Sequence, residues 1–466
     1  SSEKGNSICR TIYTTMCDSA DKNFQPKKPQ GGRISSAYLP DQLSGARVAT
    51  TPTDNGYYMV CRLLYKPKDK NPTLEQLGYE KFHIEDLARL TAKTAGITII
   101  SGPTGSGKST TLQVVISSLI TEADGKSHVI TVEDPPEYSI FGWENSKQKI
   151  FNSDGTIKMQ LLVDENGSPI RDEHGNEQYV EELGKKIKSF ATQTPVNNAR
   201  GKEQRTEKMN EQISAAMRLD PEVIMIGEVR DAASAGAAVQ AALTGHQVFT
   251  TVHANNALTI FPRLIDIGAK RELVCDADVV VGLIAQRLTK KLCKHCSKPL
   301  LENLDTFCET PNGLASLKRL LVSFGAYESI DDIKNNNDYH GLVKNATQHS
   351  IDLTGVRMRS KTGCGACNNT GLSGRSVVAE IIVTDHNYMQ LVLQDKKAEL
   401  QEYWLKELNG VDMCMHGLLK IKQGTADVGE MEREIGHIEL NEFTNLIHLQ
   451  KLLKETELPT CQRMIE

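Results

Sequence analysis

The loop from Gly102 to Ser109, Gly-Pro-Thr-Gly-Ser-Gly-Lys-Ser, constrains the fold of this chain more than any other feature. It matches the pattern GxxxxGK[ST] at every fixed position, follows an apolar run at residues 97–100 and precedes a helical pattern at residues 110–120. Glycines let backbone N–H groups turn inward around an anion, and the start of the next helix adds partial positive charge. A chance glycine-rich turn would not need both flanking elements. We therefore expect a phosphate-binding loop in an α/β domain.

The side chains of this loop have defined tasks at a nucleotide. Lys108 offers a mobile cation to the outer phosphates, and the Ser109 hydroxyl offers a ligand to Mg²⁺. ATP and Mg²⁺ are therefore the expected substrate and ion. The predicted nucleotide-binding residues are Gly102, Pro103, Thr104, Gly105, Ser106, Gly107, Lys108, Ser109 and Thr110.

Further segments extend the α/β pattern around the loop. Short apolar runs at residues 128–132, 223–226 and 248–252 alternate with helical patterns, of which residues 232–243 form the clearest. Buried strands that alternate with helices predict a parallel sheet. The sequence from Asp385 onward is helical by periodicity.

Two segments depart from this pattern. Residues 46–50 and 58–64 alternate in polarity around the turn signal Asp54-Asn55-Gly56, which predicts antiparallel strands in a small domain of about 70 residues. Residues 152–177 contain three turn signals ending in glycine. They predict a β-hairpin inserted into the α/β domain.

Two of the predicted strands are followed by acidic residues, Glu133 and Glu228. Ligands bind beyond the carboxyl ends of parallel strands, so we expect both acids to point at the same crevice as Lys108. In P-loop enzymes an acid at the end of such a strand orients Mg²⁺ or the attacking water. A helix N-cap or a solvated strand end is the alternative for either acid alone.

Histidines bracket the strand predicted at residues 248–252. His253 follows its end, where a side chain could sense the γ-phosphate, and His246 precedes its start. A lone histidine is often a satisfied structural residue, and that alternative stays open for both, more strongly for His246.

The 11 cysteines include two CxxC pairs, Cys293 with Cys296 and Cys364 with Cys367. Two such turns can form a closed tetrahedral Cys₄ zinc site, which stabilises a subdomain and does not catalyse. A redox CxxC is the competing interpretation, but it does not need a second pair. The sequence therefore favours Zn²⁺. The other seven cysteines do not occur at a spacing typical of metal or redox pairs, and we interpret them as ordinary thiols in a reducing compartment.

Composition limits the classes of function. The 466 residues carry a formal net charge of −5, with 39% hydrophobic and 24% charged residues, as is ordinary for a globular protein. No apolar run approaches the ~20 residues that span a bilayer. The charge, and the lack of a basic stretch interleaved with aromatics, disfavour a nucleic-acid motor.

Four blocks of sequence resemble the hexameric ATPases of type II secretion and type IV pilus assembly. The stretch 193–199 further resembles the type IVb branch with bundle-forming or thin pili, and the resemblance as a whole covers about residues 30–440. The blocks are the loop 102–109, residues 132–138 like the Asp box, residues 219–231 like the Walker B motif, and residues 243–255 like the His box.

The resemblance implies an α/β architecture with a RecA-like P-loop ATPase domain. Because relatives usually carry further N-terminal sequence and this chain opens on Ser1 without Met, we expect a motor without its docking arm. The implied domains are a partial PAS-like (N2) α+β domain with linker at 1–72, the ATPase core at 73–290 with a hairpin inserted at about 152–177, a zinc subdomain at 291–380 and a helical region at 381–466.

The resemblance also implies roles for individual residues. Glu228 activates or positions water with help from Glu133, and the N-terminal domain contributes arginines to a neighbour's nucleotide. Exposed strand arginines without such a role are the alternative, and Arg230 could instead support the subunit interface. The implied catalytic residues are Glu228, Glu133, Lys108, His253, Arg33, Arg47 and Arg62.

The function implied by the resemblance is pilin extrusion driven by ATP hydrolysis. The expected particle is a cytoplasmic homo-hexamer at the inner face of the bacterial inner membrane, associated peripherally through a platform protein and other pilus assembly proteins, without nucleic acid. Residues 371–375 resemble assembly motors, whereas retraction motors generally lack the cysteine element. The alternatives are a type II secretion, conjugative or DNA-uptake motor, and a nucleotide-binding scaffold without turnover, against which Glu228 argues.

Overall fold

The protein forms two compact units, Ser1–Asn71 with Gln113–Ile224, and Pro72–Leu112 with Met225–Glu466. Most of the predicted insertion, the stretch 66–70 and residues 197–200 lie outside the described residues. The computed structural model describes residues 2–17, 23–54, 56–65, 71–134, 136–144, 159–161, 169, 171, 176, 179–181, 187–196, 202–309, 311–349 and 351–455.

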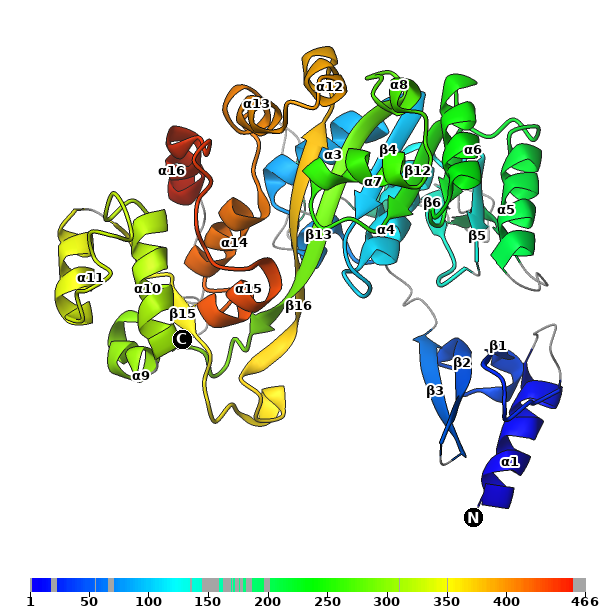
Figure 1. Ribbon diagram of the computed structural model, residues 1–466, viewed down its shortest axis with the longest axis horizontal. Coiled ribbons are helices and arrows are strands. Elements are labelled where there is room, and N and C mark those ends of the chain that lie inside the picture. Colours follow the sequence, from blue (N-terminus) through cyan, green and yellow to red (C-terminus); the bar gives the residue numbers. More distant parts are fainter. Residues whose placement is uncertain are drawn as a thin grey trace. The chain divides into compact units, whose positions relative to one another are not determined.

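The first unit begins with a helix packed on a three-stranded antiparallel sheet (Figure 1). Ile34, Ala46 and Val48 share one face of the sheet and pack with Tyr13 and Cys17 in an apolar core. The predicted antiparallel strands are confirmed, whereas the polar first helix has no clear sequence signal. The elements are α1 (Ser2–Thr11), the π-helical turn η1 (Ile12–Met16), β1 (Gln30–Ser35), η2 (Ser36–Tyr38), β2 (Leu43–Thr53) and β3 (Gly56–Tyr65).

The rest of this unit carries short strands in pairs. β5 (Val129–Glu133) pairs in parallel with β10 (Thr192–Pro195), and β6 (Phe141–Glu144) pairs antiparallel with β9 (Ile187–Phe190). The described strand of the predicted insertion, β7 (Met159–Leu161), pairs antiparallel with β8 (Tyr179–Glu181). Helix α5 (Lys202–Ala216) packs against β5.

Seven strands hydrogen bond in the order β10-β5-β11-β12-β4-β13-β16. β12 and β13 run parallel to β4, and β16 runs antiparallel to β13. The four strands predicted from apolar runs are all present, so the α/β class is confirmed. The strands not yet bounded are β4 (Gly96–Ser101), β11 (Val223–Ile226), β12 (Gln247–Val252), β13 (Val280–Leu292) and β16 (Leu372–Val383).

Helices alternate along the chain with the strands of this sheet. α6 contacts β4 and β12, and α3 contacts β16 (Figure 1). The helix that follows the glycine-rich loop, α4, is present as predicted. These helices are α2 (Leu74–Leu77), α3 (Lys81–Thr91), α4 (Lys108–Glu122), α6 (Ala232–Leu243), η3 (Ala257–Thr259), α7 (Ile260–Asp266) and α8 (Arg271–Val274).

The chain after β13 is mostly helical. The long segment between the two cysteine pairs contains helices α9–α11, and the predicted helical region after Asp385 is confirmed as far as residue 455, beyond which residues 456–466 lie outside the described part of the chain. The elements are β14 (Lys298–Pro299), η4 (Leu301–Asn303), α9 (Leu304–Cys308), α10 (Pro311–Ser323), α11 (Tyr339–Gln348), β15 (Arg357–Met358), η5 (Gly365–Cys367), α12 (His386–Leu393), α13 (Lys397–Glu402), η6 (Tyr403–Glu407), α14 (Met413–Lys422), α15 (Val428–Ile435) and α16 (Leu446–Glu455).

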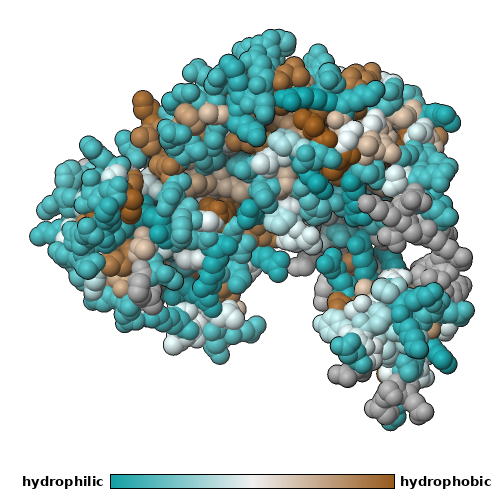
Figure 2. Space-filling model, in the orientation of Figure 1, coloured by the Kyte–Doolittle hydropathy of each residue, from teal (hydrophilic) through white to brown (hydrophobic). Residues whose placement is uncertain are grey.

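The surface drawn in Figure 2 is mostly hydrophilic, with hydrophobic residues gathered in small patches, one of them over α16. In that helix Leu446 and Ile447 are exposed. Among the described residues, every helix is too short or too polar to cross a membrane.

Candidate nucleotide site and cysteine centre

The glycine-rich loop leaves β4 and enters α4, so the predicted strand–loop–helix context is confirmed. Gly102, Gly105 and Gly107 have φ angles of 146°, 82° and 88°, a region that favours glycine. Lys108 Nζ donates to the carbonyl oxygens of Gly102 at 2.7 Å and of Pro103 at 3.2 Å. The ammonium group is therefore folded over the loop.

Two buried polar residues support this loop from the second unit. Gln286 in β13 donates from Nε2 to the Ser106 carbonyl oxygen at 2.7 Å, and the Tyr79 hydroxyl donates to Gln286 Oε1 at 2.7 Å. Neither residue was among those expected in the site. The available signal was the position of Gln286, a polar residue directly after the apolar run 279–285.

Glu228 is held on both carboxylate oxygens in a bend after β11. Arg230 Nη2 lies 2.7 Å from Oε2, and His253 Nε2 lies 3.1 Å from Oε1. Thr251 fixes this bend because its hydroxyl donates to the Gly227 carbonyl at 2.8 Å and its own carbonyl accepts from Val229 N. The structure thus brings Glu228, Arg230 and His253 together.

The two histidines around β12 have different surroundings. His253 contacts the candidate acid, whereas His246 Nδ1 lies 3.1 Å from the Ala241 carbonyl oxygen and 3.0 Å from Thr244 Oγ1. Those two partners lie in and directly after the last turn of α6. His246 therefore satisfies polar groups at the end of a helix, as expected for a structural residue.

Glu133 ends β5 in the first unit and is nearly buried. Thr131 Oγ1 and Gln193 Nε2 donate to the same oxygen, Glu133 Oε1, at 2.7 and 3.0 Å. Burial raises the pKa of Glu133 above its ordinary value, and the two hydrogen bonds oppose that shift. Gln193 also donates to the Tyr138 carbonyl at 2.9 Å and so joins the acid to the loop that follows it.

The three predicted arginines form a row across the N-terminal sheet. Arg33 lies opposite Arg47 in the register of β1 and β2, and Arg47 lies opposite Arg62 in that of β2 and β3. Their face is opposite to the one that packs on the first helix. Like charges directly opposite one another destabilise a sheet, so this arrangement requires nearby negative charge or dipoles.

Two members of the row contact the segment after Glu133. Arg33 Nη1 donates to the Pro136 carbonyl oxygen at 3.2 Å, and Arg47 Nη1 lies 3.6 Å from Glu137 Oε1. Arg62 is exposed, and no hydrogen bond or ion pair joins its side chain to any residue that the structure describes. The first unit therefore brings Glu133 and the arginine row to one segment, while the second unit holds the loop and Glu228.

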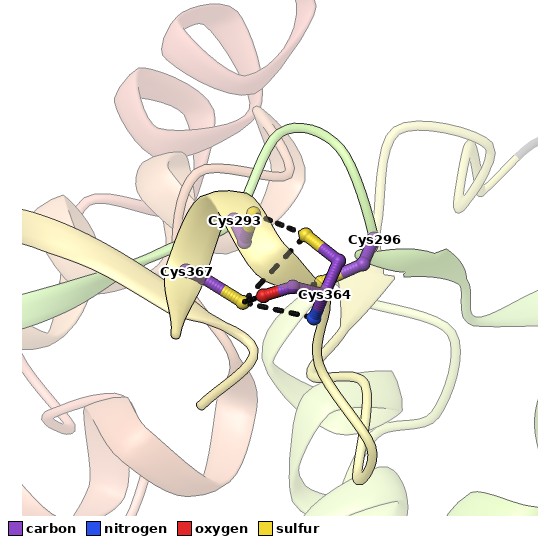
Figure 3. A group of neighbouring side chains, drawn as sticks. All are labelled: Cys293, Cys296, Cys364 and Cys367. Atoms are coloured by element: carbon purple, nitrogen blue, oxygen red, sulfur yellow. Dashed lines mark hydrogen bonds between the residues drawn. The ribbon is translucent and has the colours of Figure 1, made fainter. Parts of the chain in front are cut away.

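The four CxxC cysteines converge at the ends of β13 and β16 (Figure 3). Their sulfur atoms all lie within 4.8 Å of one another. The Sγ–Sγ distances of Cys293–Cys364, Cys296–Cys367 and Cys364–Cys367 are each 3.8 Å.

These distances distinguish the possible uses of the four thiols. A disulfide bond is about 2.05 Å long, so these sulfurs are unbonded. Tetrahedral zinc with Zn–S bonds of ~2.3 Å separates its sulfur ligands by about 3.8 Å, which the cluster matches. Backbone N–H groups of Cys364 and Gly371 donate to Cys367 Sγ at 3.2 Å each and stabilise thiolate charge. The four residues fit a closed Zn²⁺ site.

Comparisons with known proteins agree on one family. The sequence matches the family described as Type II/IV secretion system protein over residues 2–165 and 183–433. It is 27% identical over 429 residues to the type II secretion system ATPase E of Vibrio cholerae serotype O1, covering 91% of this chain and 64% of the relative. It is 27% identical over 415 residues to the type IV pilus assembly ATPase TfpB of Acinetobacter baylyi, covering 88% and 54%.

The chain therefore spans only part of the length of these two relatives. Among solved structures, the pilus retraction motor PilT with bound ADP aligns with a TM-score of 0.47 and 19% identity, covering 87% of this chain and 77% of that one.

Proposed function

Because this chain belongs to the type II/IV secretion system protein family, we propose that it converts ATP hydrolysis into mechanical work for type IV pilus assembly. The observation that carries the hydrolysis part of the proposal is the arrangement at Glu228, whose two oxygens are each held by a cationic or imidazole group. The same unit contains the complete glycine-rich loop, so a phosphate site and a candidate base are provided together.

In this proposal the loop binds the ATP phosphates through its backbone N–H groups and Lys108, and Ser109 holds Mg²⁺, which neutralises phosphate charge when bound. Water attacks the γ-phosphorus while the bond to the ADP oxygen breaks with its electron pair. Glu228 accepts the proton of the attacking water. Arg230 and His253 fix the direction of that carboxylate, which is the requirement for a positioned general base.

We assign the arginine row to the nucleotide of a neighbouring subunit in a hexameric ring. A row of guanidinium groups suits the charge that develops on a transferring phosphoryl group. Glu133 supports the reaction from its own segment, where its raised pKa favours proton acceptance. This proposal includes two domain assignments. Residues 1–72 are a partial PAS-like (N2) domain with its linker, and residues 73–290 are the ATPase core.

The cysteine centre is assigned to structural zinc within residues 291–380, followed by the helical region at 381–466. Four cysteine ligands leave no open position for a substrate, so the metal would stabilise the fold and not take part in hydrolysis.

The names of the relatives point to two different cellular systems, type IV pilus assembly and type II secretion. TfpB is described as a type IV pilus assembly ATPase, whereas the Vibrio cholerae relative is a type II secretion ATPase. We propose pilus assembly at the inner face of the inner membrane, with an inner-membrane platform protein as partner. Deletion of the gene should abolish pili and leave protein secretion intact, and the reverse phenotype would assign the motor to secretion.

The central test is steady-state ATP hydrolysis by Glu228→Gln. Loss of the base should reduce kcat roughly 10²–10⁴-fold while nucleotide binding persists. Lys108→Ala should lose binding as well, because it removes the cation at the phosphates. Glu222→Gln is the matched control, since Glu222 precedes the same strand and accepts from His128 N at 2.6 Å. If the wild type turns over no faster than Glu228→Gln, the protein is a nucleotide-binding scaffold.

A further inference from the structure

Gln286 has an unusual environment for an amide side chain. It is fully buried in β13, beside the strand that leads into the glycine-rich loop. A buried amide is destabilising unless its donor and acceptor are both paired. Here Nε2 donates to the Ser106 carbonyl at 2.7 Å, and Oε1 accepts from the Tyr79 hydroxyl at 2.7 Å. Both ends of the amide are therefore used.

The hydrogen bonds form a chain with one direction. The Tyr79 oxygen also lies 3.2 Å from Thr111 Oγ1. A phenol has a single proton, so when Tyr79 donates to Gln286, the Thr111 hydroxyl donates to Tyr79. The chain runs from Thr111 in α4 through Tyr79 and Gln286 to the Ser106 carbonyl. Its two ends both lie in or next to the loop, and its middle lies outside it.

This chain fixes the orientation of one peptide in the loop. The carbonyl of Ser106 and the N–H of Gly107 belong to the same planar trans peptide, so they point in opposite directions. Gln286 holds the carbonyl towards the protein interior, and the Gly107 N–H is therefore directed away from it. Backbone N–H groups directed outward in this way bind the phosphates of a nucleotide.

The loop also packs directly on Gln286. A Cβ atom at Gly102 would lie 2.4 Å from the Gln286 carbonyl oxygen, and one at Gly107 would lie 3.3 Å from its Nε2. Tyr79 is fixed in turn by its neighbours, because Lys420 of α14 donates to the Gly78 carbonyl at 2.6 Å and Gln423 donates to Glu80 at 3.1 Å. We call the hydrogen bonds from Thr111 through Tyr79 and Gln286 to Ser106 the relay, and neighbouring residues therefore fix both Tyr79 and Gln286.

We propose that Tyr79 and Gln286 are positioning residues that set the Ser106–Gly107 peptide for phosphate binding. The inference rests on the proposed nucleotide site. Because a backbone N–H contacts phosphate in the ground state and in the transition state alike, loss of the relay weakens both equally. The variants should therefore raise KM and the Kd of ADP and leave kcat nearly unchanged.

The test compares Gln286→Met, Tyr79→Phe and the double variant of the full chain. Mg-ADP affinity is measured by titration calorimetry, and KM and kcat by steady-state hydrolysis. Gln286→Met should weaken ADP binding about tenfold and Tyr79→Phe about threefold. Because Tyr79 acts through Gln286, the double variant should bind ADP as Gln286→Met does. Thr289→Val is the control, since Thr289 is buried in the same strand and its hydroxyl has no partner among the described residues.

Each outcome decides the proposal. Unchanged ADP affinity in Tyr79→Phe and Gln286→Met would overturn it, as would losses that add in the double variant or a loss of kcat at constant KM. If Gln286→Met fails to fold, Tyr79→Phe, which lacks one oxygen atom, decides alone. Failure of the wild type to bind ADP would remove the proposed function and this inference together, whereas wild-type binding with unaffected variants removes the inference only.

Discussion

At the scale of single residues, Glu380 joins the segment after His253 to the C-terminal helices. This buried carboxylate in β16 accepts from the backbone N–H of Ala257 at 2.6 Å and of Met413 at 3.3 Å. Burial raises the pKa of Glu380 to about 7, and the nearby Asp412 carboxylate adds to the shift, against the attraction of Arg287. Burial, together with the charge of Glu380, raises the pKa of the Tyr388 hydroxyl.

This pKa predicts how stability depends on pH. Glu380 titrates near 7 when folded and near its ordinary 4.5 when unfolded, so the folded state binds more protons between those values. The stabilising contribution is complete below pH 4.5 and is lost as the pH rises through 7. The loss is on the order of 3–4 kcal/mol.

Urea unfolding of the wild type and Glu380→Gln at pH 5 and pH 8 checks this prediction. The amide does not ionise, and its single oxygen still accepts from one of the two backbone N–H groups, so the free energy of unfolding should fall less in the variant between the two pH values. The difference between the two proteins isolates Glu380 from other titrating groups. An equal fall in both proteins would mean that folded Glu380 is already ionised at pH 5, and would contradict the prediction.

At the scale of elements, the cysteine centre predicts close to one zinc per chain. Metal analysis should find it, and chelation or Cys364→Ser should lower the melting temperature by at least about 5 °C, because metal-binding energy contributes to folding. Cys308→Ser is the matched control, since Cys308 lies in α9 between the two pairs and outside the cluster. A metal-free chain that melts at the wild-type temperature would rule out a structural zinc site.

The elements also show what the sequence could predict. The strands β4, β5, β11 and β12 are short apolar runs, and the glycine-rich loop has fixed spacing, so local pattern suffices for both. β13 was missed although its first half is the apolar run 279–285, and its second half is polar enough to hide its full length. The contact between Tyr79 and Gln286 joins residues 207 positions apart, and no local pattern encodes it. Gln193 at Glu133 and Glu137 at Arg47 were missed for the same reason.

At the scale of the whole molecule, the arginine row predicts catalysis shared between subunits. Arg62 is the most informative residue to mutate, because Arg33 and Arg47 also contact their own chain. Arg62→Ala should reduce kcat about 10³-fold if its guanidinium reaches a neighbour's nucleotide. Mixing Arg62→Ala with Glu228→Gln should restore activity, since the first retains its base and the second supplies the arginine.

Two controls accompany this experiment. Arg10→Ala changes an exposed arginine at the end of the first helix and should keep wild-type turnover. Specific activity of the wild type should rise with protein concentration as subunits associate. Mixtures that stay inactive, or activity independent of concentration in a verified monomer, would argue against a shared site.

β13 also connects the glycine-rich loop to the cysteine centre. The strand runs from Gln286, which hydrogen bonds to the loop, to Leu292, directly before Cys293, and at a rise of ~3.3 Å per residue this stretch covers roughly 20 Å. β4 pairs with β13 over Val280–Ala285 and β16 pairs with it from Gly282 to Leu292, and a slip by one residue would turn its side chains to the wrong face. The loop and the cysteine centre are therefore joined by one continuous strand, whose pairing with β16 is interrupted by a register shift between Lys290 and Leu292.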